Sequence, residues 1–285
     1  MIRQTRYAVA SREELWSRGS LLESRLTCGE ATRDDAGILA LDTLDTALIS
    51  DCDEWMTTLR GFLEPDLRMR LVAEATPDRS SGMIIATMAG CSVVTHPQHA
   101  TADMHLLRRI ASVKAVHQHA PSDVPIVWTH GSGAVLAHEA VGHPLEYEAD
   151  PVPLPEWLHV DVALEERRAS FRDVPLMRMR HVRVSQANAP FALPARRIEV
   201  LLVDGGGYDP LTDMVTIRVS AADLIDGPAT ARLAPFEIFE SRPLLLHSIA
   251  GASGQPIRYP GVICSREGQE LFVESCAPDL LVEPQ

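Results

Sequence analysis

Two histidines and a glutamate lie together near the middle of the chain, in the segment His138-Glu139-Ala140-Val141-Gly142-His143. Neutral imidazole binds zinc, and a carboxylate beside a metal-bound water can take a proton from that water. Two histidines on one helix are also often ordinary surface or core residues. The segment alone therefore leaves two interpretations open, a hydrolytic metal site or a structural helix.

The spacing of the two histidines places a demand on the helix that carries them. In the H-E-x-x-H pattern of zinc proteases, residues i and i+4 lie about 40° apart around the axis, so both rings reach one metal. At i+5 the angle is about 140°, and a straight helix would point the rings apart. Gly142 tolerates unusual dihedral angles, and Pro144 disfavours helical geometry at His143. We therefore expect the helix to end or bulge near Gly142, so that His143 turns back towards His138.

The segments on either side of this motif predict both helices and strands. Hydrophobic spacing predicts the helices, and a capping box at Ser11–Glu14 marks the start of the first one. The expected helices cover 11–25, 52–75 (interrupted by Gly61 and Pro65), 102–119 and 134–143. The expected strands cover 37–49 (as one strand or a hairpin), 83–94 and 124–128, with a proline-rich and acidic loop over 144–156. From about residue 195 we expect short strands, with Gly205-Gly206-Gly207 as a tight turn between two of them.

These elements predict an α+β protein with two domains. The N-terminal domain, residues 1–121, is of α/β type, and a boundary is expected at Ala120-Pro121-Ser122-Asp123. The C-terminal domain, residues 122–285, is mainly antiparallel β and carries the histidine helix. A chain of 285 residues is long enough for such an arrangement.

Composition excludes several classes of partner and location. The formal net charge of −13 argues against a nucleic-acid partner, because an acidic surface repels phosphates. No apolar run reaches the roughly 18 residues of a membrane span, and no apolar segment follows the charged N-terminus as in a signal peptide. The five cysteines are odd in number and scattered, which indicates free thiols in a reducing cytoplasm.

The segment from Gly133 to Glu146 resembles the metal-binding segment of the TldD/PmbA family of metallopeptidases, whose active members read close to H-E-A-V-G-H-G-L-E. Further segments follow in the family's order, and together they are more specific than any one of them. These are Met177–Arg180 (similar to P-R-M-R-N, with His181 for the Asn), Gly205–Thr212 (G-G-G-x-x-D-P-x-T-G), Ala222–Gly227 (G-Y-L-I-E-N-G), and Cys264–Gln269 with Pro278–Leu280 (C-G-K-x-G-Q…P-x-L).

The resemblance implies a set of site residues. In TldD-type enzymes the two motif histidines and the cysteine of the terminal element hold zinc, which implies His138, His143 and Cys264 as ligands and Glu139 as the general base. A thiolate binds Zn²⁺ well. Without the family pattern, Cys264 is most simply a buried packing residue. The other four cysteines, Cys28, Cys52, Cys91 and Cys276, are expected to be packing residues.

The sequence leaves two interpretations open for each of two further residues. Glu146 belongs to the family pattern, and it either orients His143 or caps a turn. His130 precedes a Gly-Ser-Gly turn, and it either faces the active cleft or is simply exposed.

The chain also departs from the family pattern. The first 120 residues are shorter than the family's usual N-terminal domain and contain no recognisable motif. Pro144, Tyr147, Glu148, Ser265 and Arg266 replace Gly, Gly, Asp, Gly and Lys of the family. These changes leave the implied metal ligands intact and leave the substrate open.

The implied function is a zinc-dependent peptidase or amidase acting on an unfolded or modified peptide or on a biosynthetic intermediate. Family members form dimers that enclose the site, so the implied partner is a second copy or a PmbA/TldE-like subunit. The alternative is a non-catalytic PmbA/TldE-like binding subunit with a structural or vestigial metal site. A structural zinc would need a fourth protein ligand, for which Glu146 and His130 are the candidates.

Overall fold

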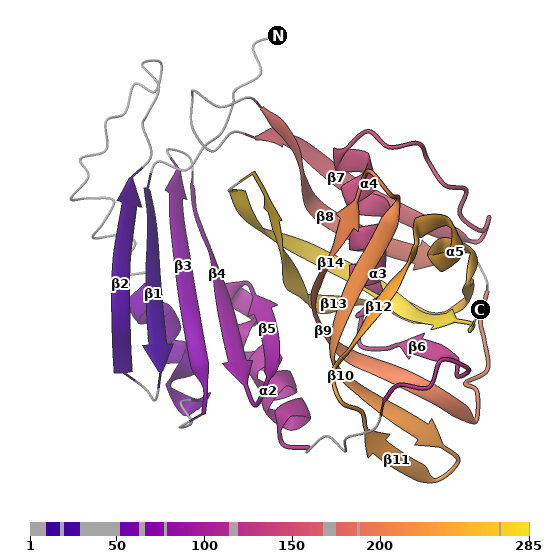
Figure 1. Cartoon of the computed structure of the whole chain (residues 1–285). Helices are drawn as coiled ribbons and strands as arrows, with labels where there is room; N and C mark the ends of the chain where they lie inside the picture. The colour runs from indigo at the N-terminus through magenta and orange to yellow at the C-terminus, as the bar shows by residue number, and fades with distance from the viewer. Residues whose placement is uncertain are drawn as a thin grey trace.

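The computed structural model describes residues 10–17, 20–28, 52–62, 66–76, 79–113, 119–167, 175–186, 189–267 and 269–284. The expected strand or hairpin over 37–49 lies outside these residues. The predicted α+β class is confirmed, since a few short helices accompany two sheets (Figure 1). None of the described helices is long and apolar enough to cross a membrane.

The N-terminal sheet has five strands in the order β2-β1-β3-β4-β5, and every neighbouring pair is antiparallel. Its strands are β1 (Ala10–Ser17), β2 (Ser20–Cys28), β3 (Arg68–Thr76), β4 (Arg79–Met88) and β5 (Cys91–Thr95). The helix predicted over 11–25 is therefore wrong. Residues of the expected capping box pair with both β2 and β3, so ladder hydrogen bonds outweigh the local signal for a helix start.

The helices of this half are shorter than their hydrophobic spacing predicted. A helix over residues 52–59 continues into the 3₁₀ turn η1 (Arg60–Phe62), and residues 68–75 of the expected helix lie in β3 instead. The second helix follows the 3₁₀ turn η2 (Pro97–His99) and is described as α2 (Ala100–Ala111). Their apolar sides pack against the sheet, with Leu59, Met104 and Leu107 fully buried. The strand expected over 83–94 is the β4–β5 hairpin, which turns at Ala89 and Gly90 with positive φ angles.

The second sheet contains nine strands. Seven follow the order β11-β10-β9-β6-β14-β8-β7, β12 pairs with β10, and β13 pairs with β14. The β6–β9 and β14–β8 pairs are parallel and the other pairs are antiparallel, as the mainly antiparallel expectation requires. The strands are β6 (Ile126–Trp128), β7 (Leu158–Arg167), β8 (Leu176–Gln186), β9 (Arg196–Asp209), β10 (Met214–Asp226), β11 (Ala229–Arg232), β12 (Phe236–Ser241), β13 (Ile249–Arg266) and β14 (Gln269–Val282). Several are longer than expected, and a short helix, α5 (Arg242–His247), precedes β13.

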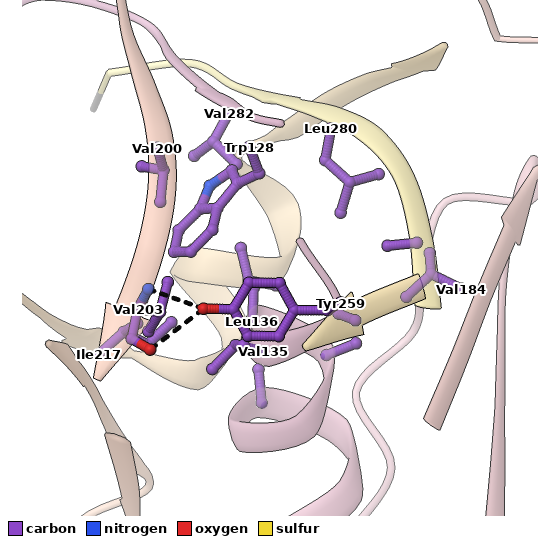
Figure 2. Close-up of a cluster of buried hydrophobic side chains, with 14 of the residues drawn as sticks. Trp128, Val135, Leu136, Val184, Val200, Val203, Ile217, Tyr259, Leu280 and Val282 are labelled. Atoms are coloured by element: carbon purple, nitrogen blue, oxygen red, sulfur yellow. Dashed lines mark hydrogen bonds between the residues drawn. The ribbon is translucent and has the colours of Figure 1, made fainter. Parts of the chain in front are cut away.

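The core of this half surrounds a buried helix, α3 (Gly133–Ala137), whose residues are all buried. Figure 2 shows Trp128, Leu136 and Leu280 among the side chains that pack there. The hydroxyl of Tyr259 accepts a hydrogen bond from the backbone N–H of Val203 at 2.8 Å and donates one to its carbonyl at 3.1 Å (Figure 2). This pairing satisfies the only polar atom of a fully buried side chain.

The two sheets share apolar contacts. Leu201, Leu202 and Ala221, from β9 and β10, pack in the hydrophobic cluster of the N-terminal sheet. Arg232 adds a polar contact, since its Nη1 donates to the carbonyl of Ile110 at 2.8 Å. The boundary at residues 121 and 122 remains a prediction.

Candidate metal centre

The two histidines lie on a helix that widens between them. After α3 the chain forms one π-helical turn, His138–Gly142, and then α4 (His143–Glu146). The backbone N–H of His143 donates to the carbonyl of His138, an i to i+5 hydrogen bond. The predicted bulge is therefore confirmed, and it brings the two rings to a centroid distance of 4.8 Å. Such π-bulges often occur at functional sites.

Pro144 does not end the helix at His143, as we had expected. His143 keeps helical dihedral angles, and Pro144 lies in the first turn of α4, so the helix continues and the loop expected from residue 144 begins after Glu146. In a regular α-helix the proline ring would clash with the carbonyl of Ala140, four residues earlier. The wider π turn is one way to avoid this clash.

Cys264 joins the histidines from a distant strand, β13. One possible ligand atom from each of His138, His143 and Cys264 lies within 4.8 Å of the others, and the Cys264 Sγ is 3.9 Å from Nε2 of His143. His138 and Cys264 are buried, and the side chain of His143 is 13% exposed. The chain thus brings all three implied ligands together, with His143 as the member that reaches the surface.

Glu146 fixes the orientation of His143. Its Oε2 lies 2.9 Å from Nδ1 of His143, and its Oε1 accepts a hydrogen bond of 2.6 Å from the backbone N–H of Met179. Because Nδ1 is engaged by the carboxylate, Nε2 is the ring nitrogen that faces Cys264 and Glu139. This is the contact by which a carboxylate holds a metal-binding histidine.

Glu139 is buried beside the same imidazole, with Oε2 3.4 Å from Nε2 of His143. It packs against β9, where a Cβ on Gly206 would lie 2.8 Å from Cγ of Glu139 and 2.3 Å from the carbonyl oxygen of Thr216. Burial raises the pKa of Glu139 to about 7, against the opposing effect of nearby positive charges. The group is therefore poised to exchange a proton near neutral pH.

The two histidines differ in their affinity for protons. Burial lowers the pKa of His138 well below its usual value, and the charges of His143 and Arg178 lower it further. Burial would also lower the pKa of His143, but hydrogen bonds to Cys264 and Glu146 and the charge of Glu139 raise it to about 11. A pKa this high favours a protonated His143 ring at neutral pH in the absence of a metal, with Glu146 and Cys264 as its hydrogen-bond partners.

The donor atoms of these three residues are of the kinds that bind zinc, and one distance between them can be compared with a zinc site. Zn–N and Zn–S bonds of about 2.0 and 2.3 Å at a tetrahedral centre separate sulfur and nitrogen by about 3.5 Å, compared with the 3.9 Å between Cys264 and His143. Nδ1 of His138 and Oε2 of Glu139 are buried without a hydrogen-bond partner among the described residues. Buried polar atoms of this kind call for a partner such as an ion or a water. Three protein ligands would leave a fourth position open, as in catalytic zinc sites.

In sequence comparisons, neither a protein-family model nor a curated protein matches the chain. Among solved structures, TldE from Thermococcus kodakarensis has a TM-score of 0.52 at 9% identity, covering 98% of this chain and 94% of that chain. The chain shares the TldE fold. A proposed modulator of DNA gyrase from Bacteroides thetaiotaomicron reaches a TM-score of 0.43 at 10% identity, covering 96% and 92% of the two chains.

The fold shared with TldE is the fold that the resemblance to the TldD/PmbA family implies. It extends into the N-terminal residues, in which no motif is recognisable. Whether the chain is of the catalytic TldD type is a separate question, since a fold does not fix a function. That question rests on the His138, His143 and Cys264 cluster.

Most segments that resemble the family pattern lie around this cluster. Met177–Arg180 is part of β8, and Pro278–Leu280 is part of β14, where the side chain of Leu280 contacts Gly133 of the buried helix. The triple glycine is not the expected turn, because it lies within β9 and the turn follows at residues 210–213. A glycine is needed there because Glu139 packs against Gly206.

His130 lies apart from the cluster. It is exposed in the turn before α3, with a φ of 55°, and its backbone N–H is hydrogen-bonded to the carboxyl of Asp279. Of the other cysteines, Cys52 and Cys91 are buried and Cys276 is partly buried, all with free thiols, while the side chain of Cys28 lies outside the described residues.

Arg178 is a site residue that the sequence did not single out. Its side chain is fully buried, and its Nη2 lies 3.3 Å from the Cys264 sulfur. The alternation Met177-Arg178-Met179-Arg180 would place both arginines on one face of a regular strand. A register shift in the β7–β8 pairing lies at this point, and Arg180 instead pairs with Glu165 near the surface. The sequence gives no signal for that shift.

Proposed function

We propose that the chain is a zinc-dependent hydrolase of the TldD type, a peptidase or amidase. The observation that carries the proposal is the convergence of His138, His143 and Cys264 beside a buried carboxylate, that of Glu139. Two imidazoles and a thiol are a suitable ligand set for zinc, and the residues come from a helix and a strand more than 100 positions apart.

Each residue has a distinct role in the proposed reaction. His138, His143 through Nε2 and Cys264 through Sγ would hold the ion, which when bound supplies an activated water and a Lewis acid for the scissile carbonyl. The carboxylate of Glu139 would accept a proton from a water at the site and would pass it to the departing amine. Glu146 keeps the ring of His143 in the orientation that presents Nε2.

The alternative is a non-catalytic binding subunit with a structural metal, which the likeness to a TldE protein favours. A closed site would need a fourth protein ligand. Both oxygens of Glu146 are already engaged, by His143 and by the Met179 N–H, and His130 lies apart from the cluster. These contacts support an open position and hence a catalytic site.

The proposed substrate is an unfolded or modified peptide, or a biosynthetic intermediate with an amide bond, bound along a sheet edge. The proposed assembly is a homodimer or a heterodimer with a PmbA/TldE-like subunit. Mass spectrometry of peptide mixtures incubated with the purified protein would identify the bond that is cleaved.

The direct test compares Glu139→Gln with Glu148→Gln, an exposed glutamate close by in the chain. We expect wild type and Glu148→Gln to bind one zinc and to hydrolyse peptides. Glu139→Gln should keep the zinc and lose about 10²- to 10⁴-fold in rate. Undiminished hydrolysis by zinc-loaded Glu139→Gln would contradict the assigned base, and wild type that binds zinc without any hydrolysis would favour the binding subunit.

A further inference from the structure

A buried arginine connects the elements that carry the cluster. Nη2 of Arg178, on β8, donates to the carbonyl oxygen of Cys264 at 2.7 Å and to its Sγ at 3.3 Å. Nη1 lies 3.4 Å from the carbonyl oxygen of Arg266, and Nε lies 3.5 Å from Oε1 of Glu146. One guanidinium thereby contacts the end of β13, on which the sulfur lies, and the carboxylate that orients His143.

Burying the charged side chain of Arg178 costs free energy, which its contacts with Cys264, Arg266 and Glu146 offset. The side chains of both Arg178 and Glu146 are fully shielded from solvent, and a buried charge is tolerated only when it is paired and hydrogen-bonded. Arginine stays protonated in proteins, and its planar fork can donate to several acceptors in fixed directions. A lysine in the same place could supply the charge but not this set of contacts.

The sum of the charges at the proposed metal centre also indicates a role for Arg178. The proposed centre contains a thiolate and the carboxylates of Glu139 and Glu146, which together exceed the two positive charges of a zinc ion by one. The guanidinium of Arg178, in contact with both the sulfur and the Glu146 carboxylate, neutralises this excess inside the protein.

We propose that Arg178 is a positioning residue of the metal centre, which holds the sulfur of Cys264 and the carboxylate of Glu146 in place for metal binding. This inference rests on the metal site proposed above. Arg178 contacts the ligands and not the substrate, so its removal acts on metal affinity and on the metal–sulfur bond.

The test uses Arg178→Met, Arg178→Lys and the matched control Arg180→Met. Arg180 lies on the same strand, but its side chain is 30% exposed and pairs with Glu165. Zinc affinity is measured by competition with a chelator, and the metal–sulfur bond by the thiolate charge-transfer absorption of the cobalt-substituted protein. We expect Arg178→Met to bind zinc about 10- to 100-fold more weakly, with a reduced or shifted charge-transfer band. Arg178→Lys should be intermediate, and Arg180→Met should match wild type.

Arg178→Met with the zinc affinity and cobalt spectrum of Arg180→Met would overturn the proposal. If Arg178→Met does not fold, Arg178→Lys decides, and a wild-type affinity and spectrum in that variant would overturn the proposal equally. A wild-type protein that binds zinc but hydrolyses nothing would contradict the hydrolase function alone, because the comparison of Arg178→Met with Arg180→Met uses binding and not activity.

Discussion

Replacing Gly206 by alanine tests the packing of Glu139 against β9. The added Cβ would lie 2.3 Å from the carbonyl oxygen of Thr216 and 2.8 and 2.9 Å from Cγ and Cδ of Glu139. Contacts this short require the backbone or the glutamate to move, and overpacking in a filled core typically costs about 1–3 kcal/mol. For a chain of this size that corresponds to a fall in melting temperature of roughly 2–12 °C. Hydrolysis should fall as well, because the displaced carboxylate is the proposed base.

Gly207→Ala is the matched control, since a Cβ at Gly207 meets nothing within 4 Å. Its stability should stay within about 0.5 kcal/mol of wild type. Both variants are compared by thermal unfolding of the zinc-loaded and the chelated protein, together with peptide hydrolysis. Equal stability and activity of Gly206→Ala and Gly207→Ala would refute the packing of the base against this strand.

Three further perturbations address the same centre. Metal-free Glu139→Gln should be more stable than wild type by about 3 kcal/mol above pH 7 and equal to it near pH 4. The pKa of Glu139 is about 7 in the folded protein and about 4.5 for an ordinary glutamate, so wild type loses stability as pH rises between these two values. Denaturant unfolding across this range checks it, and parallel pH profiles would contradict the burial of the carboxylate. Zinc binding should release the proton of His143, so that the zinc affinity rises with pH. Calorimetry in buffers of different ionisation enthalpy measures the number of protons released. Zinc binding without proton release would contradict a protonated His143 imidazole. Gly142→Ala should destabilise the protein by no more than about 1 kcal/mol, because its Cβ would lie 2.3 Å from Sδ at the flexible end of the buried Met179 side chain. Gly61→Ala, whose Cβ meets nothing within 4 Å, serves as the control in thermal unfolding.

The sequence predicted the parts of the site that depend on local geometry. The i to i+5 spacing of His138 and His143 predicted a bulge, and the π turn supplies it, although Gly142 keeps ordinary helical dihedral angles rather than the unusual ones we expected. The residues from a distant strand needed other information. Cys264 has no local feature that separates a metal ligand from a packing residue, and only the resemblance to TldD/PmbA indicated it.

Other features depend on strand pairing, which local patterns do not encode. The capping box at Ser11–Glu14 has the residue types of a helix start, but these residues lie between two strand neighbours. Gly206 was assigned to a turn because glycine runs usually mark turns, whereas here its missing side chain leaves room for Glu139. The sequence did not indicate Arg178 as a site residue, because a register shift between β7 and β8 decides which of the two alternating arginines is buried.

The strand β14 explains how the elements of the centre come together. It pairs with β6, which leads into the histidine helix, with β8, which carries Arg178, and with β13, which carries Cys264. Leu280 of this strand also contacts Gly133 at the start of the helix, where a Cβ would lie 2.7 Å from its side chain. The distances between the sulfur and the imidazoles are therefore set largely by the register of a strand that contributes no proposed ligand. Motif spacing can identify the reacting residues of such a site. The distances between these residues depend on apolar contacts between strands that are far apart in the sequence.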